Sequence, residues 1–195
     1  MDKQIASPIL SSRLADAFTW AAQLHAEQAR KRSTIPYLSH LMIVAGTVIE
    51  HGGSEVQAIA ALLHDAAEDQ GGRPTLDEIR IRFGNEVAHI VDACTDTFDY
   101  PKPDWRPRKA AYLRRMRNET AGARLVAAAD KLHNFSTTRD DLRRDGNAAW
   151  AKFNAPKEGQ LWYFRECVSA LSASGVSPIV AKLAGVVDEI AWLAQ

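Results

Sequence analysis

The chain has 195 residues, a length that suits one domain, and it is 46% hydrophobic and 25% charged, as ordinary soluble proteins are. Its 24 basic and 24 acidic residues give a net charge of zero, so an anionic ligand must be held by a local cluster of cations. Cys94 and Cys167 form no CxxC pattern, which argues against a disulfide framework. The first five residues lack a signal-peptide pattern and no apolar stretch reaches about 18 residues, so we expect a cytoplasmic protein.

Helical periodicity begins near the start of the chain. Apolar residues recur at helical spacing from about residue 10 to 29 and again from 38 to 50, where two glycines end the segment. Ser54 begins the next helix, because Gln57 follows it three residues later in a capping-box pattern.

The same signals continue toward the C-terminus. Thr75 opens a further capping pattern, and Gly84 ends the short helix that follows. Ser177 before Pro178, a cap followed by proline at the first helical position, begins the last helix. The helices expected between them cover residues 86–97, 107–119, 123–144 and 157–172. No segment alternates with a period of two, so we predict an all-α fold of about eight or nine helices in one domain, residues 1–195.

One helical segment, residues 59–69, places ionisable side chains in an apolar run. His64 and Asp65 follow five apolar residues, and a buried carboxylate is costly unless something neutralises it. Imidazole and carboxylate are both ordinary ligands for divalent metals. Glu68 and Asp69 follow one helical turn later. Four ionisable groups within six residues indicate a reaction centre.

Two further residues complete a possible metal site. His40 lies near the start of the preceding helix, and Asp130 interrupts the apolar stretch 125–132, where periodicity calls for core. Two imidazoles and two carboxylates from three helices supply four ligands and leave positions for water and substrate. Such open coordination is what a hydrolytic metal requires.

Three motifs in the chain resemble those of a known family. The segments Ile35–His40, Ala60–Asp69 and Ala129–Asn134 are similar to the motifs of the RelA/SpoT hydrolase domain, within the HD superfamily of metal-dependent phosphohydrolases. Stand-alone members are the small alarmone hydrolases, including the metazoan SpoT homologues. The likeness runs from about Ala17 to Leu171. It implies an HD-domain helical bundle that hydrolyses the 3′-pyrophosphate of guanosine tetra- and pentaphosphate with manganese.

The resemblance also implies roles for individual residues. The positions that match metal ligands, for one ion per chain, are His40, His64, Asp65 and Asp130. The positions that match the catalytic acids, which position and deprotonate the attacking water, are Glu68 and Asp69. The positions that match substrate contacts are Arg30, Lys31, Lys131, Asn134 and Tyr163.

The chain departs from the family pattern after Asn134. The family usually continues with Leu or Met and then Arg, whereas Phe135 and Ser136 stand here. Arg139 and Arg143, on the same predicted helix, are candidates to replace that arginine. A second group of cations would be needed for the 5′ end of the substrate. The candidates for it are Arg108–Lys109, Arg114–Arg115 and Arg143–Arg144.

Simpler interpretations compete with several of these assignments. Residues 30–32 would otherwise be an exposed basic cluster, and Glu68 with Asp69 a solvated helix end. The histidines interpreted as packing or surface residues are His25, His51, His89 and His133.

Three functions follow from the sequence. The first is alarmone hydrolysis, with a small phosphorylated guanosine nucleotide as the partner. The second is an HD phosphohydrolase that acts on another phosphorylated nucleotide or dinucleotide cofactor. The third is a non-catalytic nucleotide-binding regulatory module, against which the two acids argue. We expect no nucleic-acid or membrane partner, and a homo-oligomer stays open.

Overall fold

The protein is described by a computed structural model that covers residues 10–195. The N-terminal segment considered above for a signal peptide lies outside these residues. The described part contains ten α-helices, one 3-10 helix (η1) and no strand beyond an isolated bridge between Ala29 and Pro36. The elements are α1 (Ser12–Leu24), α2 (Leu38–Glu50), α3 (Glu55–Leu63), α4 (Ala66–Asp69), α5 (Arg73–Phe83), α6 (Asn85–Cys94), α7 (Trp105–Met116), α8 (Ala121–Asp145), η1 (Gly146–Lys152), α9 (Lys157–Leu171) and α10 (Pro178–Leu193). The predicted all-α fold is confirmed.

Helix α3 lies at the centre of the N-terminal half. Residues 58–63 are all buried, and three of them are alanines that let α1, α2, α6 and α8 pack closely around the helix. The predicted capping box is present at its start, with Gln57 N–H donating to the Ser54 hydroxyl and the Gln57 side chain accepting from Ser54 N–H. Because α3 is buried on all sides, the residue that follows it, His64, is buried as well.

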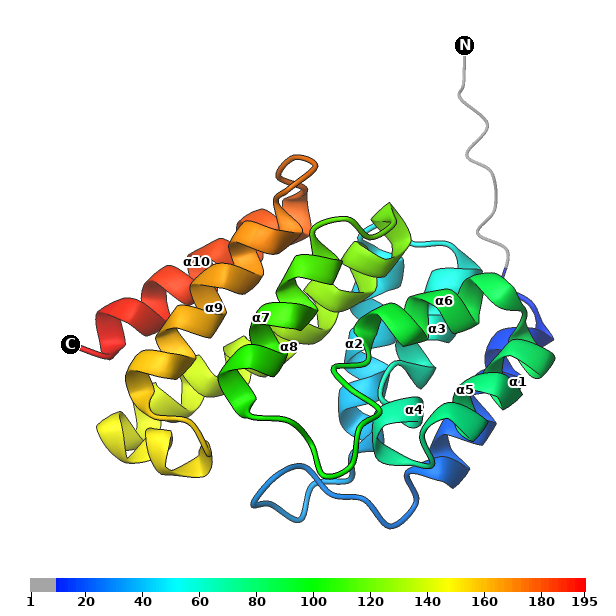
Figure 1. Ribbon diagram of the computed structural model, residues 1–195, viewed down its shortest axis with the longest axis horizontal. Coiled ribbons are helices and arrows are strands. Elements are labelled where there is room, and N and C mark those ends of the chain that lie inside the picture. Colours follow the sequence, from blue (N-terminus) through cyan, green and yellow to red (C-terminus); the bar gives the residue numbers. More distant parts are fainter. Residues whose placement is uncertain (1–9) are drawn as a thin grey trace.

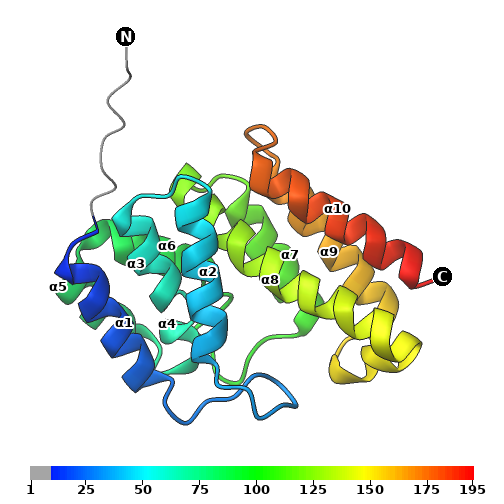
Figure 2. The same cartoon turned by 180° about the vertical axis from the view of Figure 1, so that it is seen from behind.

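Helix α8 joins the two halves of the molecule. Its 25 residues span about 37 Å. It packs against α2, α3 and α6 in the N-terminal half and against α9, α10 and η1 in the C-terminal half. Figures 1 and 2 show the helices α1–α6 on one side and α9 and α10 on the other, with α8 passing between them. One helix can therefore contribute to both ends of a shared cavity.

The structure corrects the predicted helix pattern at three places. The segment 59–69 is not one helix, because α3 ends at Leu63 and α4 begins at Ala66. Thr75 is not a cap: α5 begins at Arg73, and the buried Thr75 hydroxyl donates to the carbonyl of Gln70 at 2.8 Å. Helix η1 was not expected. With the short α4 counted, the ten α-helices exceed the eight or nine predicted. None of the described helices is long and apolar enough to cross a membrane.

Candidate metal centre and adjoining cavity

Helices α2 and α8 and the junction between α3 and α4 bring the four predicted metal ligands together. His40 lies in the first turn of α2, His64 follows the last residue of α3, and Asp65 precedes α4. Asp130 lies in α8, directly after the buried residues 126–129. Both imidazoles are completely buried, and Asp130 is 7% exposed. Charged and polar groups at this depth need compensating partners.

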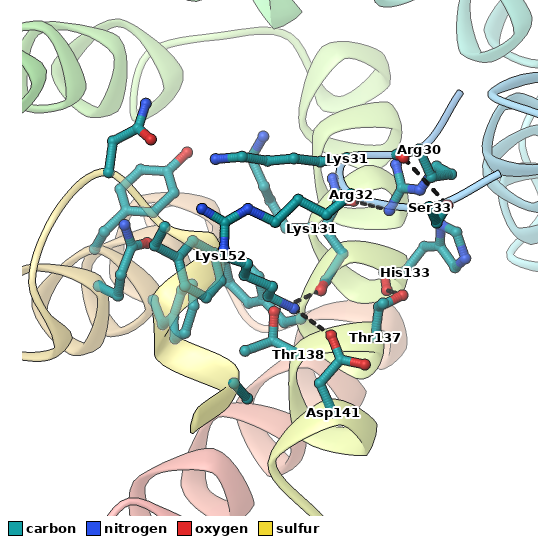
Figure 3. Close-up of a pocket in the computed structure, with 18 of the residues that line it drawn as sticks. Arg30, Lys31, Arg32, Ser33, Lys131, His133, Thr137, Thr138, Asp141 and Lys152 are labelled. Atoms are coloured by element: carbon teal, nitrogen blue, oxygen red, sulfur yellow. Dashed lines mark hydrogen bonds and ion pairs between the residues drawn. The ribbon is translucent and has the colours of Figure 1, made fainter. Parts of the chain in front are cut away.

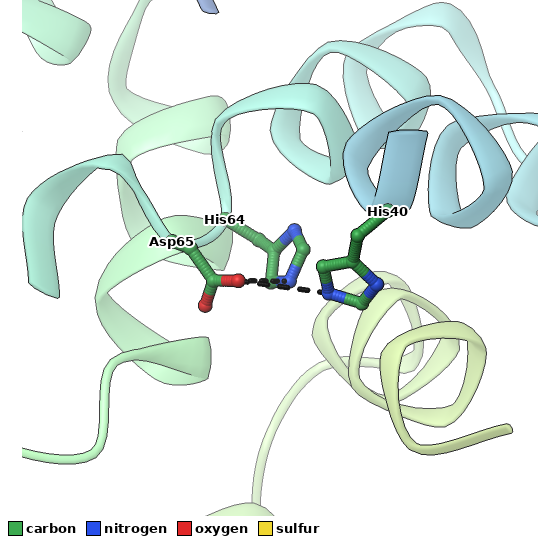
Figure 4. Close-up of side chains that lie close together, drawn as sticks. All are labelled: His40, His64 and Asp65. Atoms are coloured by element: carbon green, nitrogen blue, oxygen red, sulfur yellow. Dashed lines mark ion pairs between the residues drawn. The ribbon is translucent and has the colours of Figure 1, made fainter. Parts of the chain in front are cut away.

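The ligand atoms of these side chains point toward a common position. One nitrogen or oxygen atom from each of His40, His64 and Asp65 lies within 4.8 Å of the others (Figure 4). Asp65 Oδ2 lies 3.0 Å from His64 Nε2 and 3.6 Å from His40 Nε2. Asp130 Oδ1 lies 3.2 Å from His40 Nε2 and 3.7 Å from His64 Nε2. The two imidazoles and two carboxylates predicted from the sequence thus converge.

The two imidazole Nε2 atoms have no other partner. Each is buried and lacks a hydrogen bond to any residue between 10 and 195. The opposite ring nitrogens are engaged: His64 Nδ1 lies 2.8 Å from the Ala61 carbonyl, and His40 Nδ1 lies 2.6 Å from His133 Nδ1. A ring that donates through Nδ1 presents a lone pair at Nε2. This donor set fits a divalent metal that accepts mixed nitrogen and oxygen ligands.

Neighbouring donors hold the two carboxylates. The Tyr37 hydroxyl donates to Asp65 Oδ2 at 2.5 Å. Lys131 Nζ donates to Asp130 Oδ2 at 2.6 Å, and Asn134 Nδ2 donates to Asp130 Oδ1 at 2.5 Å. Burial by itself would raise the pKa of Asp130, but Lys131 and the two imidazoles outweigh it and hold that pKa well below its usual range. Asp130 is therefore an anion at neutral pH.

The two predicted catalytic acids have different surroundings. Glu68 lines the cavity described below, and its side chain is 18% exposed. Its Oε1 accepts from Lys102 Nζ at 2.7 Å and its Oε2 from the backbone N–H of Asp96 at 2.9 Å. Asp69 is exposed and accepts from Gln28 Nε2 at 2.8 Å. The interpretation as a solvated helix end therefore describes Asp69 better than Glu68.

A cavity of about 1100 Å³ adjoins the cluster (Figure 3). Nine lysine and arginine side chains line it, against four carboxylates, although the whole chain has no net charge. Arg30, Lys31 and Arg32, from the loop between α1 and α2, are part of this lining, and none of them forms an ion pair within residues 10–195. In Figure 3, Lys31 and Arg32 extend into the cavity. This is the local cationic cluster that an anionic ligand requires.

The far wall of the cavity is formed by the end of α8 and by η1. Lys152 donates to Asp141 at 2.5 Å (Figure 3). Arg144 also lines the cavity, whereas Arg139 and Arg143 do not, because both pair with Glu189 of α10. The suggestion that Arg139 or Arg143 replaces the missing arginine is therefore wrong.

Of the cations predicted on α7 for the 5′ end of the substrate, only one pair lines the cavity. Arg108 and Lys109 line the cavity and both pair with Asp96. Arg114 and Arg115 do not line it, and Arg115 donates to the Thr95 carbonyl at 2.7 Å. The Arg114–Arg115 pair is thus excluded as part of the cavity wall.

All five predicted substrate contacts line the cavity, and four of them also contact the structure around it. Lys131 and Asn134 hold Asp130, as described above. Tyr163 is largely buried, with its ring 5.9 Å from Trp105 and 6.3 Å from Phe135. Phe135, at the position that departs from the family pattern, lines the same wall. Arg30 donates to Asn134 Oδ1 at 2.7 Å and so joins the basic loop to α8.

Several residues at the site were not found from the sequence. His133 was interpreted as a packing or surface residue, yet it contacts His40. Its position three residues after Asp130, on the same helix face, was a usable signal. Gln28, Lys102 and Lys152 lie in loops or at the end of η1, where no periodicity indicates which way a side chain faces.

Comparisons with a family model and with curated proteins indicate the same family. The chain matches the HD domain family over residues 17–161. It is 34% identical over 145 residues to guanosine-3′,5′-bis(diphosphate) 3′-pyrophosphohydrolase MESH1 of Homo sapiens, covering 73% of this chain and 76% of that protein. The Xenopus tropicalis protein of the same name is 35% identical over 140 residues, covering 70% and 73%.

A solved structure shares the fold. It is described as a metazoan ortholog of SpoT that hydrolyses ppGpp, and it matches with a TM-score of 0.72 over 91% of this chain and 95% of that one. The sequence identity is 24%, so this match establishes the helical arrangement and not the activity.

Proposed function

Because this chain belongs to the HD-domain family, we propose that it is a metal-dependent phosphohydrolase that removes the 3′-pyrophosphate of guanosine tetra- and pentaphosphate. The observation that carries the proposal is the His–Asp cluster, with two buried and unpartnered Nε2 atoms, beside a cavity rich in cations. Relatives that bear the name of this activity support the choice of substrate. We take manganese as the metal, as the family resemblance of the sequence motifs implies. We take one domain as the catalytic unit because residues between 30 and 164 line one cavity.

Each group in the site has a part in the proposed reaction. A divalent metal held by the cluster would supply Lewis-acid activation of water and of a phosphoryl oxygen. Glu68 would accept a proton from the attacking water, which adds to the phosphorus next to the 3′ oxygen. The bond between that phosphorus and the 3′ oxygen breaks, and the 3′ oxygen takes up a proton. Arg30 and Lys31 would offset the charge that develops on the phosphoryl oxygens.

An alternative substrate is favoured by one feature of the cavity wall. Phe135 stands where the family usually has Leu or Met, and it lines the cavity beside Tyr163. A wall altered at this position is compatible with another phosphorylated nucleotide or a dinucleotide cofactor. Assays of the purified protein with manganese and a panel of phosphorylated nucleotides distinguish the two.

Removing the metal should destabilise the protein. Stripping leaves two carboxylates and two buried imidazoles without their common partner, so a chelator should lower the melting temperature by roughly 10 °C. Elemental analysis before stripping should give about one divalent ion per chain. Full hydrolytic activity in protein shown by the same analysis to be metal-free would contradict the assignment.

The substrate assignment can be tested through charge. Lys31→Ala should lower kcat/KM for every phosphorylated nucleotide, because Lys31 is expected at the reacting group. A lost charge-assisted contact to phosphate should cost about 1.5–3 kcal/mol, or roughly 10- to 150-fold. Lys152→Met, on the far wall, should instead reduce kcat/KM for guanosine tetraphosphate much more than for the analogue with a free 5′-hydroxyl.

Lys182 provides the matched control for this experiment. It is an exposed lysine of α10 whose Nζ lies 3.2 Å from His51 Nε2 and which does not line the cavity. Lys182→Met should leave kcat/KM for both substrates unchanged. Equal losses on the two substrates from Lys152→Met, or none, would show that the 5′ end is not recognised at the far wall.

A further inference from the structure

His133 lies against a predicted metal ligand from a different helix. It belongs to α8, whereas His40 belongs to α2, and the two Nδ1 atoms are 2.6 Å apart. The rings are stacked, with centroids 4.9 Å apart and an interplanar angle of 21°. His40 is completely buried, so solvent does not reach its ring while His133 is in place.

Two nitrogens at hydrogen-bonding distance share one proton. If His133 carries it, His40 must hold its own proton on Nε2, the atom that faces the carboxylates of Asp65 and Asp130. If His40 carries it on Nδ1, its Nε2 presents a lone pair to the metal position. Only the second arrangement makes His40 a ligand.

His64 shows how the same requirement is met elsewhere in the cluster. Its Nδ1 faces the carbonyl of Ala61 at 2.8 Å, and a carbonyl can only accept. This contact keeps the proton on Nδ1 and leaves Nε2 free. Metal-binding histidines commonly donate their second N–H to a carbonyl, a carboxylate or water, which orients the ring and sets its tautomer. For His40, the group beside Nδ1 is instead the imidazole of His133.

We propose that His133 is a positioning residue for the metal centre. Its Nδ1 accepts a hydrogen bond from His40 Nδ1–H and thereby fixes the tautomer and the ring orientation in which His40 Nε2 binds a divalent metal. The inference rests on the metal site of the proposed function. Without an acceptor at position 133, the His40 Nδ1–H group would be a buried donor with no partner, and the Nε2–H tautomer would compete with metal binding.

Metal binding to the full-length protein tests this role directly. Chelator-stripped samples are titrated with Mn²⁺, and the dissociation constant is obtained from the electron paramagnetic resonance signal of free Mn²⁺. His133→Phe keeps a stacked ring without an acceptor and should weaken binding by about 10- to 100-fold. His133→Asn should stay within about threefold of the original protein, because asparagine places Oδ1 where histidine has Nδ1, both bonded to Cγ.

Controls separate this role from a structural one. Both metal-free variants should remain folded, as cooperative melting shows, so that weaker Mn²⁺ binding reports the lost acceptor and not a loss of structure. His51→Phe, which removes an imidazole at the other end of α2, should leave the Mn²⁺ dissociation constant unchanged. Unweakened Mn²⁺ binding by His133→Phe, or equal weakening in the phenylalanine and asparagine variants, would overturn the proposal.

Two further outcomes are decisive. If the unaltered protein binds no Mn²⁺, Zn²⁺ or Fe²⁺, the metal site of the proposed function fails, and this inference fails with it. If His133→Phe does not fold, ¹⁵N resonances of the imidazoles in the metal-free protein answer the question. A proton on His40 Nδ1 supports the proposal, and a proton on Nε2 overturns it.

Discussion

Replacing Glu68 by glutamine should lower kcat by about 10²–10⁴ while the protein keeps its metal. Glutamine retains the shape of the side chain but cannot accept a proton from water. Glu68 is not among the atoms that converge on the metal position, so metal content should stay near one ion per chain. Both of its oxygens now accept hydrogen bonds, from Lys102 and from the backbone of Asp96, and these donors hold the carboxylate beside the cavity.

Steady-state kinetics and elemental analysis on the same preparation measure the two quantities. Glu50→Gln is the matched control. Glu50 is exposed at the end of α2, ten residues from His40 and about 15 Å along the helix. An unchanged kcat in Glu68→Gln would remove Glu68 as the proton acceptor. Loss of metal from Glu68→Gln would instead indicate that Glu68 is a metal ligand.

Replacing Asp65 by asparagine should have the opposite signature, with loss of the metal itself. A neutral amide is a poor substitute for an anionic ligand. Loss of a hydrogen bond to a metal ligand weakens metal binding by up to roughly 100-fold, so loss of the ligand itself should raise the dissociation constant for Mn²⁺ by more than that. The metal-free variant loses the anion that Tyr37 and His64 contact, so its melting temperature should lie below that of the metal-free original. Mn²⁺ should then no longer raise the melting temperature.

Asp188→Asn is the control for this change. Asp188 is exposed on α10, which contributes no residue to the cluster. Its metal affinity and its response to Mn²⁺ should equal those of the unaltered protein. If Asp65→Asn binds Mn²⁺ as tightly as the control, the division between ligands and proton acceptor is incorrect. Together with Glu68→Gln, this variant separates metal binding from chemistry.

Local signals in the sequence were enough to predict most helices and to single out the four side chains that converge at the candidate metal centre. Ser54 and Gln57 mark the start of α3, and Ser177 before Pro178 marks the start of α10, because a cap involves residues only a few positions apart. His64, Asp65 and Asp130 stand out because ionisable groups in apolar runs are costly without a partner. That cost is a property of composition and periodicity, so it is visible without a structure.

The conformation within the His–Asp segment was decided by packing. Periodicity predicted one continuous helix over residues 59–69, but the chain ends α3 at Leu63 and begins α4 at Ala66. At this point His64 must face the cluster while Glu68 faces the cavity and contacts Lys102. A spacing rule that assumes an unbroken helix cannot detect such a change of direction.

Contacts between segments that are distant in the chain could not be predicted from the sequence either. His133 meets His40 across 93 positions, so its role depends on how α8 crosses α2. Arg143 and Arg144 are neighbours with the same charge, yet α10 engages one through Glu189 and the other lines the cavity. Residue type and periodicity determined which groups this protein has for chemistry. Only the packing of helices against one another decided which of them share a cavity, because the direction of a side chain depends on what the opposite face of its helix is packed against.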